Sequence, residues 1–400
     1  MSSPVAVNPA KRFRQLTKNI NIWTNLLGVD VLAPKVKFNY RTWTTTFAIV
    51  NYTGFTIFSM VDNGGDWRVS LKASLMMGGL FHGLGKFLTC LLKQRTMKRL
   101  TFFACNIYEE YEGKSEVHYR TLDMNIDRLL GLMRGIRNGY MATFLLMTIL
   151  PMAMLLYDGT RVTVMQYQIP GLPLENNVCY SITYLIQLVT IGVAGCGFYA
   201  GDLFVLLGLS QIFAFADILQ LKVDDLNAAL DRKSEARALV SLGATITGEE
   251  RRQELLLDLI KWHQLFTNYC HTVNELYHDL IATQVLSMAV AVMLSFCIIL
   301  TSFHMPSAIY FLVSAYSMSV YCVLGTKIEF AYDQVYESIC SVSWQELSCD
   351  QRKLVGPMMR EAQNPQSIKL LGILPLSVRT ALQIIKLIYS LSMMMMQNRT

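Results

Sequence analysis

Two ionisable side chains, His82 and Lys86, interrupt an apolar stretch that is long enough to cross a membrane. They stand one helical turn apart, so they share a face if the stretch is a helix. An ionisable group at membrane depth suggests a functional site, because inserting a central lysine costs about 2.5–3.5 kcal/mol. Lys86 is close to the inner end, and we interpret it as snorkelling to the interface. His82 is deeper, among glycines, and either packs between helices or faces a ligand pocket.

The sequence contains none of the common catalytic motifs: it has no glycine-rich phosphate loop, paired CxxC, HExxH or GxSxG. His263, His271 and His278 fall on roughly one face of a predicted helix. Neighbouring members of this group are separated by about 10 Å along the axis, which is too far for shared metal coordination. We therefore expect no enzyme, no catalytic residue, no metal site and no cofactor.

Aromatic and methionine side chains are frequent in the outer halves of several apolar stretches. Walls of this kind suit small apolar ligands, because dispersion and desolvation then supply the affinity. The same residue types also fill any helical membrane bundle, so helix packing is the alternative interpretation of each one. Chosen by depth and face, the candidate ligand-binding residues are Gly79, His82, Met147, Leu150, Met154, Tyr184, Leu188, Ile191, Tyr310 and Phe311.

The last apolar stretch has one face that begins polar and ends in methionine. Its members recur at helical spacing, and they are Gln383, Leu387, Ser390, Met394 and Gln397. A polar path that leads to a hydrophobic constriction is what a water-filled pore with a gate requires. Packing of this face against a neighbouring helix is the alternative.

The chain that positions these residues is too apolar for an ordinary soluble protein, because 52% of its 400 residues are hydrophobic and only 16% are charged. We predict an all-α polytopic membrane protein. Seven stretches have the length of a transmembrane helix. They are Trp43–Met60, Ser74–Leu92, Gly139–Tyr157, Ser181–Leu209, Asp279–Phe303, Pro306–Leu324 and Gly372–Met396.

Basic residues predict the orientation, since Lys and Arg near the ends of spans are retained in the cytoplasm. The segments on one side of the seven predicted spans hold 28 of them, and the segments on the other side hold four. The N-terminus is therefore expected in the cytoplasm and the C-terminus outside the cell. Only Cys179 of the nine cysteines falls in a predicted outer loop, so we expect no external disulfide.

The basic N-terminal segment, residues 1–42, is predicted to be cytoplasmic. It has apolar residues at spacings of three and four, namely Phe13, Leu16, Ile20, Trp23 and Leu27. We expect an amphipathic helix that lies on the inner leaflet, with a solvated tail as the alternative.

Two regions resemble the insect odorant receptors. The first, Leu259–Leu300, has a histidine, His263, followed by a helix that runs into the fifth span. The second, Trp344–Met394, is similar to the family's anchor helix and terminal segment. Its matching residues are Trp344, Arg352, Lys353, Gln363, Pro365, Lys386, Tyr389 and Ser390. The chain lacks the family coreceptor's insertion between the fourth and fifth spans, so it resembles a ligand-tuning subunit.

The resemblance implies a single channel domain over residues 1–400, with spans one to six and the ligand pocket in 43–324, a cytoplasmic anchor in 325–371 and a pore-lining helix in 372–400. It also implies a heterotetramer with the odorant receptor coreceptor in the plasma membrane of olfactory sensory neurons. Expected partners are a small volatile odorant, monovalent and divalent cations and membrane lipid, but no nucleic acid. Met394 corresponds to the gate region and Ser390 lies below it, although the family's gate is richer in Val and Leu.

Other classes of membrane protein remain as alternatives. A gustatory receptor shares the expected fold but would form a channel without the coreceptor. A G-protein-coupled receptor would need an external N-terminus, which the basic residues oppose. A transporter would usually show an internal repeat or a pair of broken helices, and the sequence shows neither.

Overall fold

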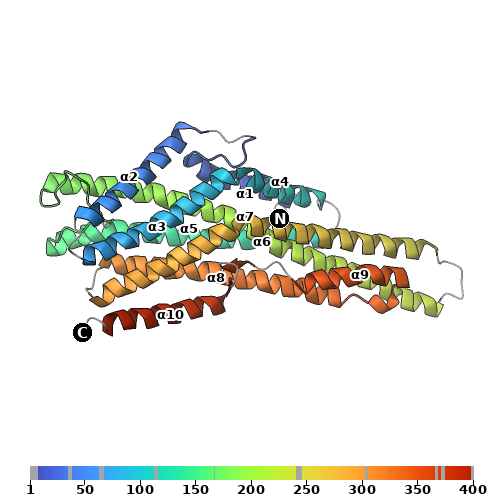
Figure 1. The fold of residues 1–400 in the computed structure, drawn as a ribbon. Coiled ribbons are helices and arrows are strands. Elements are labelled where there is room, and N and C mark those ends of the chain that lie inside the picture. The colour runs from blue at the N-terminus through green and yellow to red at the C-terminus, as the bar shows by residue number, and fades with distance from the viewer. Residues whose placement is uncertain are drawn as a thin grey trace, which may run out of the picture.

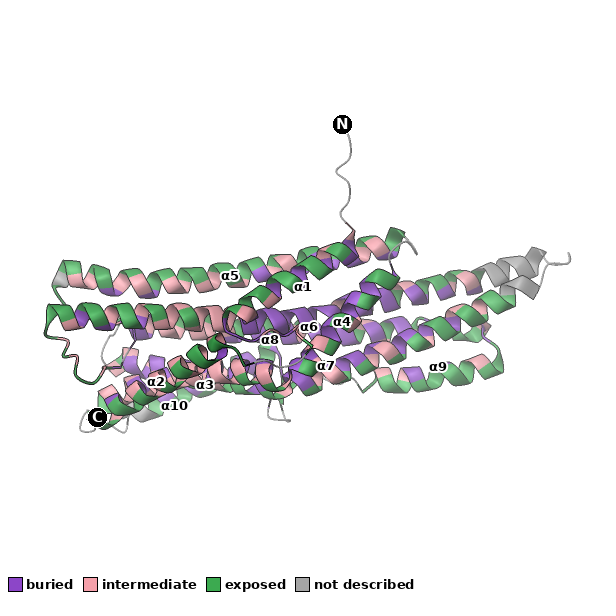
Figure 2. Cartoon of the chain, turned by 90° about the horizontal axis from the view of Figure 1, so that it is seen from above, coloured by how far each residue is buried: buried purple, intermediate pink, exposed green. Residues whose placement is uncertain are grey.

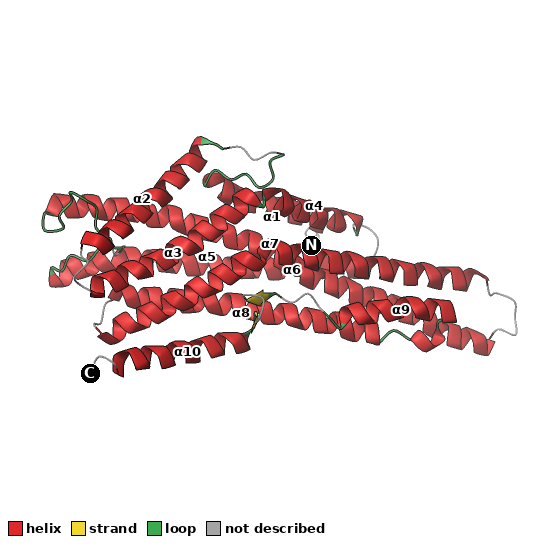
Figure 3. Cartoon of the chain, in the orientation of Figure 1, coloured by secondary structure: helices red, strands yellow, loops and turns green. Residues whose placement is uncertain are grey.

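The computed structural model describes residues 8–34, 38–62, 67–111, 116–165, 167–239, 246–301, 305–364, 368–370 and 374–397. Within these ranges the chain is almost entirely helical, with one short hairpin (Figure 3). In chain order the elements are α1 (Pro9–Leu26), α2 (Tyr40–Asp62), α3 (Trp67–Leu92), α4 (Gln94–Glu110), α5 (Glu116–Asp158), α6 (Asn177–Leu239), α7 (Ile246–Thr301), α8 (Met305–Cys340), a 3-10 turn (Trp344–Glu346), α9 (Cys349–Ala362), β1 (Lys369–Leu370), β2 (Leu374–Pro375) and α10 (Val378–Gln397).

Four long helices, α5 to α8, run side by side along an elongated bundle (Figure 1). Helices α2, α3 and α10 lie toward one end, and α9 lies toward the other. A bilayer requires about 20 helical residues, whereas α6 has 63 and α7 has 56. These helices are therefore much longer than a membrane requires.

Five helices of the described chain, α3, α5, α6, α7 and α8, are long and apolar enough to cross a membrane. They contain the second to sixth predicted spans in order, up to the last described residue of each. The first predicted span lies in α2, a helix of 23 residues that is not among the five. The count of seven spans and the orientation remain predictions.

The last helix starts later than the sequence pattern indicates. The predicted span begins at Gly372, but α10 begins at Val378, after the antiparallel hairpin of β1 and β2. The cause is local, because Ser377 caps the helix by accepting the backbone N–H of Thr380, at 3.3 Å. The Thr380 hydroxyl donates in turn to the carbonyl of Pro375, at 2.7 Å. The start predicted at Gly372 is therefore wrong by about one and a half turns.

The predicted amphipathic N-terminal helix is present as α1, but its apolar face packs on the protein rather than on a leaflet. Phe13 is fully buried and stacks on Tyr108 of α4, with ring centroids 4.3 Å apart. Ile20 is also buried, and Trp23 meets Tyr199 of α6 edge to face at 5.2 Å. The expected contact of this face with lipid is wrong, because α4 and α6 offer it an apolar surface within the chain.

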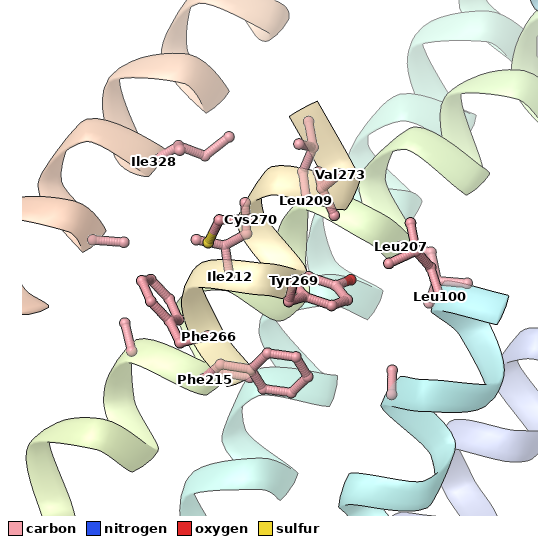
Figure 4. Packing of buried hydrophobic residues seen from close by; sticks show 14 of the residues in the cluster. Leu100, Leu207, Leu209, Ile212, Phe215, Phe266, Tyr269, Cys270, Val273 and Ile328 are labelled. Atoms are coloured by element: carbon pink, nitrogen blue, oxygen red, sulfur yellow. The ribbon is translucent and has the colours of Figure 1, made fainter. Parts of the chain in front are cut away.

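A large buried apolar cluster includes the stretch where α6 and α7 run together, and Figure 2 shows buried residues gathered on α6. Phe215 of α6 contacts Tyr269 of α7 edge to face at 4.9 Å (Figure 4). The Tyr269 hydroxyl donates to the carbonyl of Gly208, at 2.8 Å, and the Trp262 indole donates to that of Phe215, at 3.0 Å. These buried donors pair with backbone carbonyls of the neighbouring helix, so they fix how α6 and α7 lie against each other.

The hairpin before α10 rests against Gly325 of α8. A Cβ at this position would stand 2.0 Å from the carbonyl oxygen of Leu376, which is backbone and has little freedom to move. We expect Gly325→Ala to lower the stability by about 1–3 kcal/mol. The measurement is thermal unfolding of the purified protein in detergent. Gly131→Ala is the matched control, because nothing lies within 4 Å of its added methyl group, and equal melting temperatures for the two variants would contradict the packing.

Candidate functional site

A mostly apolar cavity of about 230 Å³ lies between α2, α3, α5, α6 and α8. Its wall includes Tyr52 of α2, Phe87 of α3, Phe144 of α5, Phe198 of α6 and Val313 of α8. Pockets for drug-sized molecules measure about 300–1,000 Å³, so this one suits a smaller ligand. Because few polar groups line it, the affinity for an occupant comes mainly from dispersion and desolvation.

Four of the ten predicted ligand-binding residues line this cavity, and they are Gly79, Met147, Ile191 and Tyr310. Two more, Leu150 and Tyr184, pack beside Met147 in an adjoining apolar cluster. The Tyr184 hydroxyl donates to the carbonyl of Thr148, at 2.6 Å, so its polar end is already occupied. The other four do not line the cavity in the described part of the chain, and they are His82, Met154, Leu188 and Phe311.

His82 does not line the cavity, but it contacts a residue that does. It is buried, and its ring lies edge to face against Phe198 at 4.9 Å, while Phe198 itself lines the cavity. Of the two sequence interpretations, the structure therefore favours helix packing. The glycine beside it serves the same contact, because a Cβ at Gly83 would stand 2.8 Å from the Phe198 ring.

The connection between α5 and α6 folds into the bundle and contributes to the cavity wall. Met165 of this loop lines the cavity, and Tyr167 packs against Tyr52 and Phe55 of α2. Gln187 of α6 holds the loop in place: its side chain accepts from the Met165 N–H at 2.9 Å and donates to the Tyr167 carbonyl at 3.1 Å. The sequence pattern indicated only an exposed outer loop here.

Lys86 does not snorkel, which corrects the sequence interpretation. Its side chain is 2% exposed, and its Nζ lies 2.5 Å from Oδ1 of Asp202 in α6, which is itself 6% exposed. Nζ also donates to the carbonyl of Phe198, at 3.1 Å. The close approach of α3 and α6 depends on Gly201, where a Cβ would stand 2.7 Å from Cδ of Lys86. Pairing with a buried carboxylate replaces the water that snorkelling would have supplied.

Asp202 connects four helices through its carboxylate. Tyr140 of α5 donates its hydroxyl to Oδ2 at 2.5 Å, and Tyr321 of α8 donates to Oδ1. Lys86 and Tyr140 line the large cavity, while Asp202 and Tyr321 line a second cavity of about 40 Å³. This cluster was not predicted from the sequence. A usable signal was present, because Asp202 is an acidic residue inside a predicted span and requires a buried partner.

The predicted pore face of α10 is turned away from the chain's own bundle. Gln383, Leu387, Ser390 and Met394 are exposed. The side chain of Gln397 lies outside the described residues. The opposite face packs on the bundle through Ile388 and Ser392. The Cys297 thiol of α7 donates to the Ser392 hydroxyl, at 3.5 Å. Lining of a pore by the exposed face remains a prediction.

The two regions that resemble odorant receptors contact each other, because α7 packs against α9, β1 and α10. His263 of α7 is buried beside Tyr332 of α8 and Glu361 of α9, around a cavity of about 30 Å³. Burial lowers the pKa of His263, and the Glu361 carboxylate partly opposes the shift. Arg352 fastens the start of α9 by donating to the carbonyls of Gln345 and Leu347. Pro365 lies outside the described residues.

Comparisons with known proteins agree on one family. A family model described as 7tm Odorant receptor matches residues 68–389. The chain is 69% identical over 389 residues to "Putative odorant receptor 83c" from Drosophila melanogaster, and the match covers 97% of this chain and 98% of that protein.

Two solved structures share the fold. A structure of the insect olfactory receptor OR5 from Machilis hrabei in complex with eugenol has a TM-score of 0.77 at 13% identity, covering 97% of this chain and 99% of that one. A second structure of the same receptor has a TM-score of 0.74 at 12% identity, with the same coverage. These likenesses confirm the predicted all-α fold class.

Filling the cavity should abolish ligand binding without unfolding the protein. Gly79 lines the cavity, and nothing lies within 4 Å of an added Cβ, so Gly79→Leu places its side chain in empty space. We expect volatiles that raise the melting temperature of the wild type to lose at least about 10-fold in affinity, because a ligand stabilises only the state that binds it.

The control is Gly54→Leu on α2, which also has open space around its Cβ but does not line the cavity. Equal thermal shifts for Gly79→Leu and Gly54→Leu would show that volatiles bind elsewhere.

Proposed function

Because the chain belongs to the 7tm odorant receptor family, we propose that it is the odorant-binding subunit of a heteromeric, non-selective cation channel opened by a small, mostly apolar volatile. The observation that carries the proposal is the apolar cavity between α2, α3, α5, α6 and α8. The related receptor OR5 was solved in complex with eugenol, a small molecule, which supports a ligand of similar size here.

The proposed topology has seven spans, with a cytoplasmic N-terminus and an external C-terminus. Helices α2 and α10 supply the first and last spans, since 23 and 20 residues correspond to about 30 Å of helix, the thickness of the hydrocarbon core. The excess of basic residues on one side supports this orientation. The cavity then lies in the membrane, and the packed core of α6 and α7 extends into the cytoplasm.

The proposed pore is lined by α10 from each subunit. One face of this helix packs against α7 and α8, and the other is exposed along Gln383, Leu387, Ser390 and Met394. In a tetramer the exposed face would meet its copies around a central path. Met394 and Leu387 then supply the hydrophobic constriction, and Gln383 and Ser390 supply polar contacts for hydrated monovalent and divalent cations.

Ligand binding would open the pore by favouring one of two arrangements of the helices. Three of the helices around the cavity, α3, α6 and α8, contact α7 or α10 directly. An occupant can shift the equilibrium only by the difference between its affinities for the closed and open states. The cavity and α10 are joined through packed helices, so a change in cavity shape has a physical route to the gate.

The proposed partner is the odorant receptor coreceptor, in a heterotetramer in the plasma membrane of olfactory sensory neurons. A channel of the gustatory type, which needs no coreceptor, is the alternative. We expect volatiles to evoke rapid currents only in cells that express this chain together with the coreceptor, while G-protein signalling is blocked. Currents from this chain alone would support the alternative, and currents abolished by the block would contradict a channel.

The gate assignment makes a separate prediction. Met394→Ala removes bulk from the proposed constriction, so we expect a larger leak current without ligand, or altered ion permeability, by several-fold. The control is Met393→Ala, because Met393 neighbours it on α10 and is off the proposed pore face. Currents of Met394→Ala that match the wild type in leak, permeability and amplitude would rule out this residue as the gate.

A further inference from the structure

We propose that Lys86 donates a hydrogen bond to an acceptor atom of the ligand, so that the receptor selects apolar volatiles that carry such an acceptor. The inference rests on the proposed function, because it assigns a role to one residue of the proposed odorant cavity. The acceptor is an oxygen of a ketone, aldehyde, ester, ether or alcohol.

The protein atoms near Lys86 engage two of its N–H donors. An ammonium group has three N–H donors. The first points to Oδ1 of Asp202, which lies 2.5 Å from Nζ. The second forms a hydrogen bond with the carbonyl oxygen of Phe198, which lies 3.1 Å from Nζ. The third has no hydrogen-bond partner among the described residues. Lys86 is buried and lines the cavity, so an occupant of the cavity can supply the missing acceptor.

The other hydroxyl groups on the described cavity wall already donate to protein atoms. Tyr52 and Tyr310 donate to the carbonyl and the sulfur of Met76, and Tyr140 donates to Asp202. The four threonines on the wall donate to nearby backbone carbonyls, and they are Thr24, Thr45, Thr143 and Thr190. The Cys90 thiol is only a weak donor. Lys86 is therefore the strong donor that remains for a ligand.

The cluster around Asp202 keeps Lys86 in place without a ligand. The carboxylate is held by Tyr140 and Tyr321, and the stem of Lys86 lies against Gly201. The donor is thus pre-organised, and little entropy is lost when a ligand meets it. A molecule of the same shape without an acceptor would leave a buried, charged N–H unpaired, and polar sites of this kind discriminate strongly against such analogues.

The first test compares ligands on the wild-type receptor with its coreceptor. The probes are linear ketones of increasing length, each paired with the alkene in which a CH₂ group replaces the carbonyl oxygen. A hydrogen bond to a charged group implies that each active ketone is about 10-fold or more as potent as its alkene. A ketone accepts but does not donate, so the result depends on a protein donor. Equal potencies within the pairs would overturn the inference.

The second test removes the donor together with its counter-ion. The double variant K86M/D202N removes both charges of the pair. The two tyrosines donate to different oxygens of Asp202, so the amide oxygen of the asparagine accepts from one hydroxyl, and its NH₂ group donates to the oxygen of the other. We expect the ketone preference to fall to about 2-fold or less while the alkene response persists. K86Q/D202N keeps a neutral N–H donor and should retain part of the preference.

The matched control is K222M/D258N, which removes a Lys–Asp pair between α6 and α7 that does not line the cavity. Its ketone preference should equal that of the wild type. A full preference in K86M/D202N, with surface delivery measured, would overturn the role of Lys86. Absence of currents from the wild type with every volatile would instead contradict the proposed function, which separates the two failures.

Discussion

The buried ion pair of Lys86 and Asp202 is the interaction on which the arrangement of the helices around the cavity depends. It joins α3 to α6, and the hydroxyls of Tyr140 and Tyr321 extend it to α5 and α8. Loss of one partner from such a pair costs about 3–5 kcal/mol, because a charge is left buried without compensation. The same pair forms part of the cavity wall, so the group that fixes the helices is also one that a ligand meets.

The parts of the molecule near this pair differ in how tightly their side chains fill the space between the helices. In one part, aromatic residues of α6 and α7 form a continuous buried core in which Trp262 and Tyr269 donate to backbone carbonyls. In another part, several glycines form the cavity wall, and the loop between α5 and α6, held by Gln187, contributes Met165 to that wall. Helix α10 packs along one face only. These differences support the proposal that a ligand acts at the cavity and that α10, which is packed on one face only, responds to it.

The sequence was sufficient for elements that depend on local patterns. Apolar stretches located the long helices, and spacings of three and four located α1. Choosing residues by their depth in the membrane and their helix face correctly identified Gly79, Met147, Ile191 and Tyr310 as part of the cavity wall. It did not predict that His82 turns toward Phe198, because the rotation of a helix depends on its neighbours. The Lys86–Asp202 pair joins residues far apart in the chain. A local pattern could show that Asp202 needs a buried partner, but it could not identify Lys86 as that partner. The start of α10 was misjudged because hydropathy does not register the Ser377 cap.

A structure of this chain assembled with the coreceptor and a bound ketone would test the account most directly. The account predicts density for the ketone between α2, α3, α5, α6 and α8, with its oxygen within hydrogen-bond distance of Lys86 Nζ, and the exposed face of α10 on the central axis. A ketone bound outside this cavity, or an α10 whose Leu387 and Met394 face lipid, would contradict it.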